Sequence, residues 1–173
     1  PRTAPRTPEG TIDLESPDML DMKLLDEHFT KLSRGDAVLV PHFEFARQMR
    51  NDSEGRLLKL GKNELAIFEG IHALNTEITR RHPEATRVYI SARSNIMDGE
   101  GLCFKGTWMR LARRAVRDYN FRGTDVARTL DLWDNVRRGE KLYISPYKNT
   151  AHLMFDSSLP YEVSVMASYA KPM

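Results

Sequence analysis

The sequence predicts an α/β fold in which a mainly parallel β-sheet is flanked by helices. Three observations support this class. Apolar segments of strand length alternate along the chain with segments whose apolar residues recur at helical spacing, as in strand–helix–strand units. Residues 65–68 are apolar without interruption, as expected for a strand that is buried on both faces. The chain has 173 residues, 40% of them hydrophobic, which suffices for one domain with its own core.

The first helix is predicted to begin at Ser16, after a polar and proline-containing start. Ser16 is placed to cap this helix, and Pro17 suits its first position because no N–H donor is needed there. One apolar face is formed by Leu20, Leu24, Leu25, Phe29 and Leu32. Gly35 is placed to close the helix. A short strand over residues 37–40 should follow, and Pro41 is expected to end it.

Two more strands are predicted in the middle of the chain. Residues 51–63 are polar and turn-like, whereas residues 65–68 form the predicted buried strand. A short helix through Ile78 and a strand over residues 87–90 come next. Residues 91–106 contain several glycine and asparagine residues, so a loop is predicted there.

The remainder of the chain is predicted to be mainly helical. A helix capped by Thr107 should end near Gly123, and a second helix should begin after Thr124. Residues 152–155 suggest a last strand, and residues 161–168 a final helix or strand.

Composition excludes several classes of protein. No apolar run approaches the roughly 18 residues of a membrane span, and the N-terminal residues lack the apolar core of a signal peptide. The single cysteine, Cys103, excludes an internal disulfide and a cysteine-based zinc site. A reducing, cytoplasmic location is therefore the expectation.

Charge is unevenly distributed, although the net charge is only +2. Residues 1–50 contain 7 Lys and Arg against 9 Asp and Glu, whereas residues 105–141 contain 10 against 5. The second stretch therefore predicts a cationic surface whose partner is an anion, either nucleic acid or a phosphorylated small molecule.

Four arginines of this cationic stretch share one face of the predicted helix. The spacing i, i+3, i+4, i+7 belongs to Arg110, Arg113, Arg114 and Arg117. Only Asp118 is close enough in sequence to offset them, and the planar fork of Arg fits two phosphate oxygens. With Arg122 beside the flexible Gly123, such a helix can close over phosphates as a lid. A solvated surface helix is the alternative, and nucleic-acid binding is less favoured because no aromatic platform accompanies the arginines.

Glu69 directly follows the predicted strand over residues 65–68. An acidic residue at the carboxyl end of a parallel strand lies where open α/β sheets bind ligands. Its carboxylate can hold a hydrated Mg²⁺ together with phosphate oxygens. The alternative is a glutamate that only caps the next helix, in which His72 is expected to be a helix-start residue.

The segment over residues 41–50 combines aromatic, amide and guanidinium groups after a strand. Phe43, Gln48 and Arg50 together could stack on a planar base and hydrogen-bond to its edge. The alternative is that Phe43 and Phe45 belong to the core and that the rest of the segment is a loop.

Five blocks of the chain resemble the uridine kinase and phosphoribulokinase superfamily of P-loop kinases. In chain order they are ESPDMLD, VPHFEFARQMR, LAIFEGIHALN, RLARRAVRDYNFRG and WDNVRRGEKLYISPY. From GIHALN onward, the chain is most similar to a long-form bacterial branch of uridine-kinase-like nucleoside kinases. The resemblance covers residues 8–169 and implies a P-loop NTPase-like parallel sheet flanked by helices. It also implies a helical, arginine-rich lid over about residues 105–140.

The resemblance implies roles for individual residues. Glu69 matches the family's strand-end acidic residue near Mg²⁺. The lid arginines, which contact the ATP phosphates, are matched by Arg110, Arg113, Arg114, Arg117 and Arg122. Glu15 matches a position that usually carries an Asp, which holds the ribose hydroxyls. Phe43 matches a position that usually carries a Tyr against the base. Gln48 matches a position that usually carries a His, which hydrogen-bonds to the base. Arg50 matches a substrate-side basic position. The three departures bear on pyrimidine specificity and leave phosphoryl transfer untouched.

One feature of the superfamily has no counterpart in this sequence. No Gly-rich loop of the form G-x-x-x-x-G-K-[ST] occurs, and the family's first strand and catalytic Asp would precede Pro1. We therefore expect residues 1–173 to be a partial kinase domain, the later three-quarters of it. Without the amides and the lysine that cradle the phosphates, this segment alone should neither bind ATP tightly nor be active.

The expected function is ATP- and Mg²⁺-dependent phosphoryl transfer to the 5′-hydroxyl of a nucleoside such as uridine or cytidine. Glu69, Arg114 and Arg117 are the residues expected to carry it. The expected partner is this small-molecule substrate, without a membrane or nucleic acid, and a homo-oligomer is compatible with the sequence. Two alternatives stay open: a non-catalytic relative that binds a nucleotide or nucleic acid, and a kinase for another acceptor such as a sugar phosphate or pantothenate.

Overall fold

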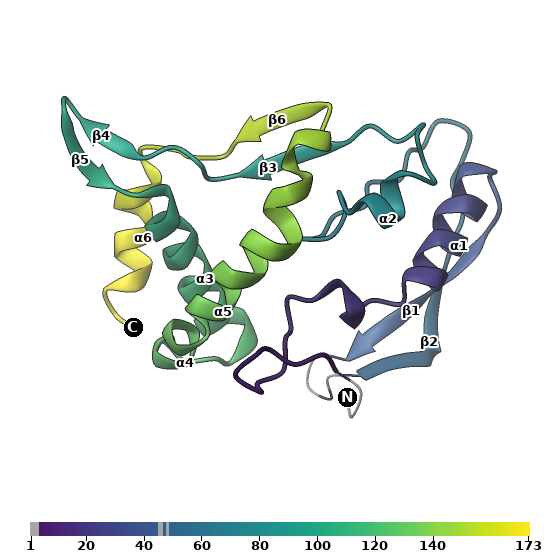
Figure 1. The fold of residues 1–173 in the computed structure, drawn as a ribbon, viewed down its shortest axis with the longest axis horizontal. Helices are drawn as coiled ribbons and strands as arrows, with labels where there is room; N and C mark the ends of the chain where they lie inside the picture. Colours follow the sequence, from purple (N-terminus) through teal and green to yellow (C-terminus); the bar gives the residue numbers. More distant parts are fainter. Residues whose placement is uncertain (1–3, 45–46, 48) are drawn as a thin grey trace. The chain divides into compact units, whose positions relative to one another are not determined.

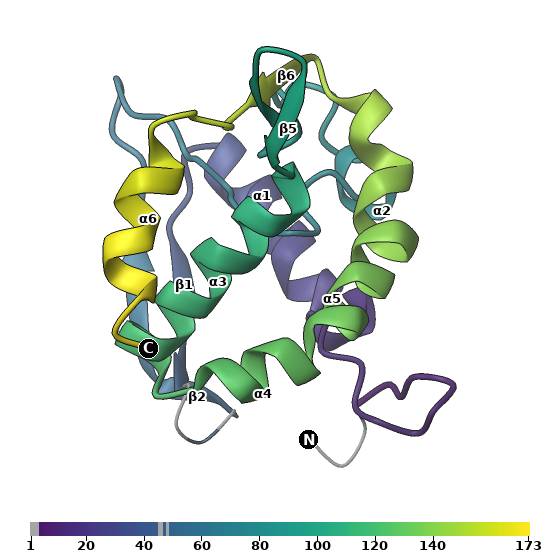
Figure 2. The same ribbon diagram turned by 90° about the vertical axis from the view of Figure 1, so that its left-hand side faces the viewer.

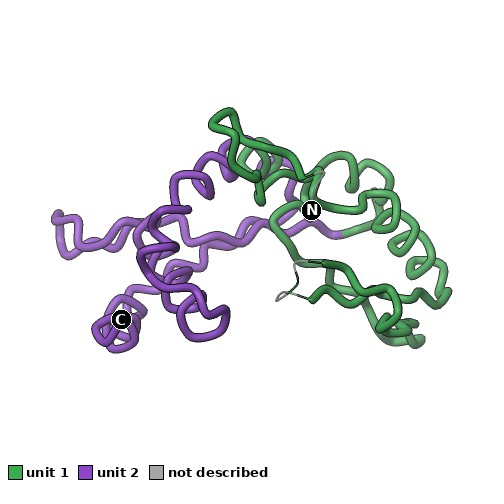
Figure 3. Tube along the Cα trace, turned by 90° about the horizontal axis from the view of Figure 1, so that it is seen from below, with its two compact units in different colours: residues 1–85, 143–147 green, residues 86–142, 148–173 purple. Residues whose placement is uncertain are grey.

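The structure is a computed structural model that describes residues 4–44, residue 47 and residues 49–173 (Figure 1). The fold is mixed α/β, with a parallel strand pair and flanking helices, as the sequence predicts, but the described strands form three separate two-stranded sheets, two of them antiparallel, and not one mainly parallel sheet. The chain divides into two compact units, which are coloured separately in Figure 3. Unit 1 contains residues 1–85 and 143–147, and unit 2 contains residues 86–142 and 148–173.

The first predicted helix in unit 1 is divided into two pieces. Ser16 caps a short 3₁₀ helix, η1 (Pro17–Met19), with its side chain accepting from the N–H of Asp18, as predicted. The α-helix α1 (Met22–Ser33) then begins separately, with Asp21 as its own cap. Aspartate suits this position because its carboxylate accepts from a free N–H of the first turn. Gly35 follows the helix end in the left-handed conformation (φ 82°), in agreement with the prediction.

An antiparallel ribbon follows α1, and it corrects two predictions. Strand β1 (Val38–Glu44) continues through Pro41, with a register irregularity between Val40 and His42. A proline, which has no N–H to donate, is tolerated at such an irregularity. The predicted turn over residues 51–63 is wrong, because strand β2 (Met49–Leu58) pairs with β1 along most of its length. Its polar side chains are compatible with a strand because most of them are exposed to solvent.

The predicted buried strand over residues 65–68 is not formed. These residues have no regular secondary structure, and the side chains of Leu65 and Ile67 are 77% and 84% exposed. A fully apolar strand is buried only where it joins a sheet and other elements cover both of its faces. In the described part of the chain, no sheet includes residues 65–68. Phe68 does find a partner, since its ring centroid lies 3.9 Å from that of Phe29 on α1. The predicted short helix is present as α2 (Thr76–Thr79).

Parallel pairing occurs in unit 2. Strand β3 (Val88–Ser91) pairs in parallel with β6 (Leu153–Asp156), and both strands were predicted. The predicted loop over residues 91–106 contains a hairpin, β4 (Ile96–Asp98) and β5 (Gly101–Phe104). Gly99 has a φ of 57° at its tip, which a side chain would disfavour.

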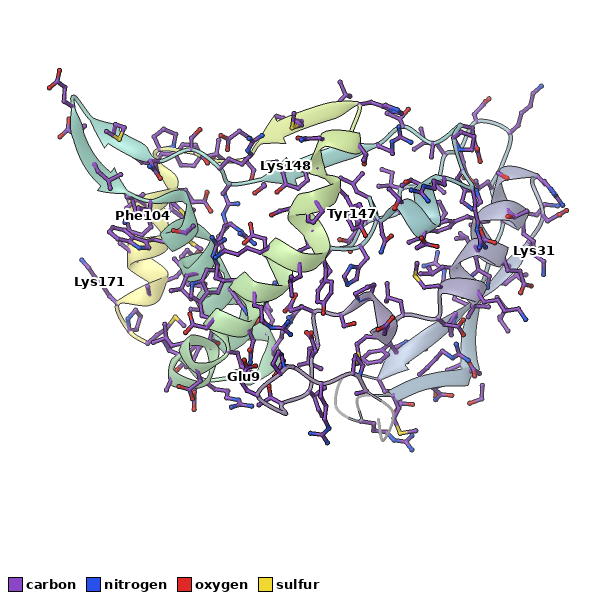
Figure 4. The ribbon with its side chains drawn as sticks, in the orientation of Figure 1. Glu9, Lys31, Phe104, Tyr147, Lys148 and Lys171 are labelled. Atoms are coloured by element: carbon purple, nitrogen blue, oxygen red, sulfur yellow. The ribbon has the colours of Figure 1, made fainter. Side chains whose placement is uncertain are left out.

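The helices of unit 2 follow the hairpin. The 17-residue helix α3 (Gly106–Arg122) starts two residues earlier than predicted, with Lys105 rather than Thr107 at the cap position. Gly106 is required there, because a Cβ atom would lie 3.0 Å from the carbonyl oxygen of Ser94. Gly123 (φ 62°) ends α3 as predicted. Phe104, labelled in Figure 4, lies where β5 leads into α3, with its ring against that of Trp108.

The second predicted helix is interrupted. It forms α4 (Val126–Asp131), capped by Asp125 rather than Thr124, and α5 (Trp133–Gly139). A π-helical turn, η2 (Glu140–Ile144), and a 3₁₀ turn, η3 (Ser145–Thr150), continue from α5. The final element is the helix α6 (Glu162–Ala170), which packs along α3 (Figures 1 and 2). No helix in the described part of the chain is long and apolar enough to cross a membrane.

Candidate phosphate-binding helix and acceptor site

The predicted lid arginines all lie on helix α3 in unit 2, and each of them forms an ion pair with a carboxylate. Arg110 pairs with Glu140, and Arg113 pairs with Glu162. The other three, Arg114, Arg117 and Arg122, pair with Asp118. Sequence spacing predicts only the contribution of Asp118, because Glu140 and Glu162 come close to α3 through the tertiary fold alone.

Arg113 is the most completely bound of these arginines. Its Nε and Nη2 donate to the two carboxylate oxygens of Glu162, and its Nη1 and Nη2 donate to the hydroxyl and carbonyl oxygens of Ser157. The hydrogen bonds that Arg113 donates to Glu162 raise the pKa of Arg113 above its usual value. A guanidinium with these bonds stabilises the packing of α6 on α3, and it would have to break them before it could bind a phosphate.

Asp118 gathers the other three arginines around one buried carboxylate. The residue is only 5% exposed, and its Oδ1 accepts from Nε and Nη2 of Arg117 at 2.9 Å and 2.8 Å. Arg114 and Arg122 each lie 3.4 Å from its carboxylate oxygens. The side chains of Arg117 and Arg122 remain 44% and 47% exposed, so solvent and ligands reach them. We call these four residues the Asp118 cluster. Arg117 and Arg122 therefore present two accessible guanidinium groups beside a single buried carboxylate.

Glu69, the predicted magnesium ligand, lies in unit 1 directly after the exposed residues 65–68. Its side chain is exposed. In the described part of the chain, no group of three or more His, Cys, Asp or Glu side chains could hold a metal ion. Mg²⁺ in kinases is bound through one or two carboxylates and by phosphate oxygens, so a single accessible carboxylate fits this requirement.

Asp156 occupies the carboxyl end of the parallel pair, where Glu69 was expected to lie. Its carboxylate accepts from the backbone N–H groups of Arg93 and Ser94, at 3.0 Å and 3.1 Å, and from the Ser94 hydroxyl. These hydrogen bonds hold the pKa of Asp156 well below its usual range, and the bond from the Ser94 side chain has the largest effect. The carboxylate therefore holds the loop that follows β3.

Two of the predicted acceptor-binding residues are brought together by the ribbon in unit 1. Phe43 on β1 lies directly opposite Arg50 on β2 in the ladder, so both side chains emerge on the same face. A depression of about 300 Å³ beside them is lined by Glu44, Arg47, Met49, Arg50, Asn51, Asp52 and Ser53. Gln48, the third predicted residue of this segment, lies outside the described residues.

Arg50 is neutralised by two carboxylates. Its Nη1 lies 2.8 Å from Asp21, and its Nε lies 2.7 Å from Asp52. These hydrogen bonds raise the pKa of Arg50, and the bond to Asp21 has the largest effect. They also tie the start of α1 to the ribbon, which sequence reasoning did not predict.

Glu15 is held by residues from three segments of unit 1. Its N–H donates to Oδ1 of the buried Asp13 at 3.2 Å, and Tyr143 donates its hydroxyl to Oδ2 of the same carboxylate at 3.0 Å. His72 forms a hydrogen bond with the backbone of Glu15, and burial lowers the pKa of this histidine. His72 precedes α2 in a turn and is not a helix-start residue. Sequence reasoning missed Asp13 and Tyr143, which are far apart along the chain and carry no shared motif.

Comparison with known proteins identifies the family. The sequence model described as the phosphoribulokinase / uridine kinase family matches residues 1–164. The chain belongs to the phosphoribulokinase/uridine kinase family. This finding confirms the resemblance that the five sequence blocks indicated.

Uridine kinases are among the relatives within the phosphoribulokinase/uridine kinase family. The uridine kinase of Mycoplasma pneumoniae is 27% identical over 154 residues, which are 88% of this chain and 64% of the relative. That of Mycoplasma genitalium is 27% identical over 94% of this chain and 68% of the relative. That of Clostridium novyi is 22% identical over 87% of this chain and 65% of the relative. The chain thus spans about two thirds of the length of these relatives.

Proposed function

We propose that the protein is an ATP- and Mg²⁺-dependent kinase that phosphorylates the 5′-hydroxyl of a nucleoside. The Asp118 cluster carries this proposal, because the accessible guanidinium groups of Arg117 and Arg122 share one carboxylate and offer N–H donors to a phosphate chain. Membership in the phosphoribulokinase/uridine kinase family supports it. Residues 1–173 then supply part of a kinase domain, with a lid over about residues 105–140.

Within this proposal the lid arginines have two different roles. Arg114 and Arg117, assisted by Arg122, bind the ATP phosphates and stabilise the charge that develops during phosphoryl transfer. Arg110 and Arg113 hold the lid helix in its surroundings through Glu140 and Glu162. The carboxylate of Glu162 and two oxygens of Ser157 already accept from Arg113, so it would have to give up these bonds to bind a ligand.

Glu69 would hold Mg²⁺ as a carboxylate ligand. When bound, the ion neutralises negative charge on the phosphates. The accessible side chain of Glu69 supports this role, and a phosphate chain would supply further oxygen ligands.

The neutralised Arg50 favours an uncharged acceptor. Asp21 and Asp52 already satisfy its guanidinium, so the phosphate of a sugar phosphate or the carboxylate of pantothenate would have to displace them. A nucleoside presents no such charge. Phe43, on the same face, would stack on the base, and Glu15 would accept hydrogen bonds from the ribose hydroxyls. By the resemblance alone, Gln48 would contact the edge of the base.

The test is ATP-dependent phosphorylation by the full-length protein with four acceptors: uridine, cytidine, a pentose phosphate and pantothenate. Products are identified by mass spectrometry. We expect nucleoside monophosphates, and a higher KM for 2′,3′-dideoxyuridine than for uridine because the contacts of Glu15 are lost. Turnover with only the pentose phosphate or pantothenate would overturn the choice of acceptor. Binding of ATP or an oligonucleotide without any turnover would indicate a non-catalytic relative.

A further inference from the structure

A buried set of polar side chains surrounds the backbone of Glu15 in unit 1. Asp13 is only 4% exposed, and its two carboxylate oxygens accept from different segments of the chain. Oδ1 accepts from the N–H of Glu15 at 3.2 Å, and Oδ2 accepts from the hydroxyl of Tyr143 at 3.0 Å. Asp13 is itself fixed, because its own N–H donates to the carbonyl of Pro5 at 2.8 Å. A short chain of hydrogen bonds therefore runs from Tyr143 through Asp13 to Glu15.

His72 holds Glu15 by a second hydrogen bond. This residue is 6% exposed, and its ring bonds to the backbone of Glu15. The ring of Tyr143 meets the ring of His72 edge-on, with 6.4 Å between their centroids. Tyr143 therefore contacts both Asp13 and His72, the two residues whose side chains hydrogen-bond to the backbone of Glu15. Because these residues come from three separate segments, Glu15 is positioned by tertiary contacts and not by its own loop alone.

A glutamate at this position needs such support. Its side chain has one more rotatable bond than the aspartate that the family resemblance implies at this position, so more rotamer freedom is lost when it binds a ligand. A fixed backbone limits the positions that the carboxylate can reach and reduces this loss.

We infer that Tyr143 and Asp13 are positioning residues, which fix Glu15 for contact with the hydroxyl groups of the phosphate acceptor. This inference rests on the proposed function for the role of Glu15. It assigns to the π-helical turn η2 a role on the acceptor side, since this turn carries Tyr143. π-Helical turns occur frequently at functional sites.

The experiment compares Tyr143→Phe, Asp13→Asn and the double variant in the full-length protein. Tyr143→Phe keeps the ring and removes only the hydroxyl donor. We expect each single change to raise the KM for the nucleoside roughly five- to tenfold, about what the loss of one ordinary hydrogen bond produces, while the KM for ATP stays within about twofold. The double variant should resemble the single variants, because both changes break one chain of contacts. Tyr161→Phe, an exposed tyrosine in unit 2, is the matched control and should have no effect.

Hydrogen exchange of the Glu15 amide provides a readout that needs no activity. Tyr143→Phe should accelerate this exchange, because Asp13 is then held less firmly against the Glu15 N–H. Unchanged exchange would overturn the inference whatever the acceptor is. Faster exchange with an unchanged acceptor KM would also overturn it, because Glu15 would then not depend on these contacts for binding. The proposed function is tested separately by the acceptor panel with the unmodified protein, so the two failures are distinguishable.

Discussion

Arg113 on α3 and Glu162 on α6 form a two-pronged ion pair, in which Nε and Nη2 each donate to one carboxylate oxygen. Ser157 adds its hydroxyl and its carbonyl as further acceptors. Glu162, at the start of α6, therefore binds Arg113, which sequence spacing places on the helix face expected to bind phosphate. The pair separates Arg113 from the Asp118 cluster and divides one sequence motif into a structural part and a part that we propose binds phosphate.

The first prediction concerns this pair. Arg113→Ala should lower the free energy of unfolding by about 1–3 kcal/mol, because a partly buried, two-pronged ion pair and two further hydrogen bonds are lost. Urea unfolding measures the change. The matched control is Arg128→Ala on the exposed surface of α4, which should change stability by less than about 0.5 kcal/mol. Equal stability of the two variants would show that Glu162 does not anchor α6 through Arg113.

The second prediction concerns the Asp118 cluster. Replacement of Arg114 or Arg117 by Ala removes one charged fork from the phosphates, a loss of about 1.5–3 kcal/mol, so kcat/KM for ATP should fall by roughly 10- to 150-fold. Arg→Lys should recover part of the loss, because the charge remains but the fork does not. The free energy of unfolding of the Arg117→Ala variant should fall by about 0.5–1.5 kcal/mol, because two hydrogen bonds to the buried Asp118 are lost while Arg114 and Arg122 still pair with it.

Steady-state kinetics with the full-length protein test this prediction, with Arg128→Ala again as the control. ATP kinetics that stay at the unmodified level in both variants would identify the face as a solvated surface. If the variants instead lose affinity for oligonucleotides and keep their ATP kinetics, the cluster serves a nucleic-acid-binding relative.

The third prediction concerns Glu69. Glu69→Gln should lower turnover by roughly tenfold or more, because a neutral amide is a poorer Mg²⁺ ligand and the ion is needed mainly in the transition state. Nucleoside affinity should change little, since the amide keeps the shape of the side chain. Kinetics beside a direct nucleoside titration measure the two effects. The control is Glu54→Gln, a change of an exposed side chain on β2. Near-normal turnover of the Glu69 variant would show that Glu69 does not bind the metal.

The fourth prediction concerns pH. Burial lowers the pKa of His72 below its usual value of 6.5, so below pH 6.5 the unfolded chain binds more protons there than the folded one. The contribution of His72 to stability is therefore fully present above pH 6.5 and is lost as the pH falls toward the lowered pKa. The free energy of unfolding should decrease less steeply between pH 7 and 5 in His72→Gln than in the unmodified protein. Equal slopes in the two proteins would contradict a buried, neutral His72.

Helix α3 shows how much of the candidate site could be predicted from sequence. Its arginine spacing and its closing Gly123 depend on helical geometry within one segment, and both were predicted. The partners Glu140 and Glu162 lie 30 and 49 residues from the arginines that they bind, so no local pattern indicates them. In the same way, the carboxylate at the carboxyl end of the parallel pair is Asp156 and not Glu69.

The ribbon in unit 1 shows where local patterns misled. Polar residues such as those of β2 suggest a turn, but a strand needs only a partner for its backbone, and β1 provides it. Residues 65–68 have the composition of a buried strand, but burial depends on which elements cover them. Their exposure therefore could not be predicted from the tetrapeptide itself.

The sequence by itself determined the family, the α/β class, the cap at Ser16, the glycine ends at Gly35 and Gly123, and the cationic face of α3. These features depend on residues that lie close together along the chain. Only the tertiary structure decided which arginines remain accessible, which carboxylates neutralise Arg50, and how Tyr143 and Asp13 hold Glu15. The physical reason is that hydrogen bonds and ion pairs depend on distances of about 3 Å between atoms, which side chains from remote segments reach only after the chain has folded.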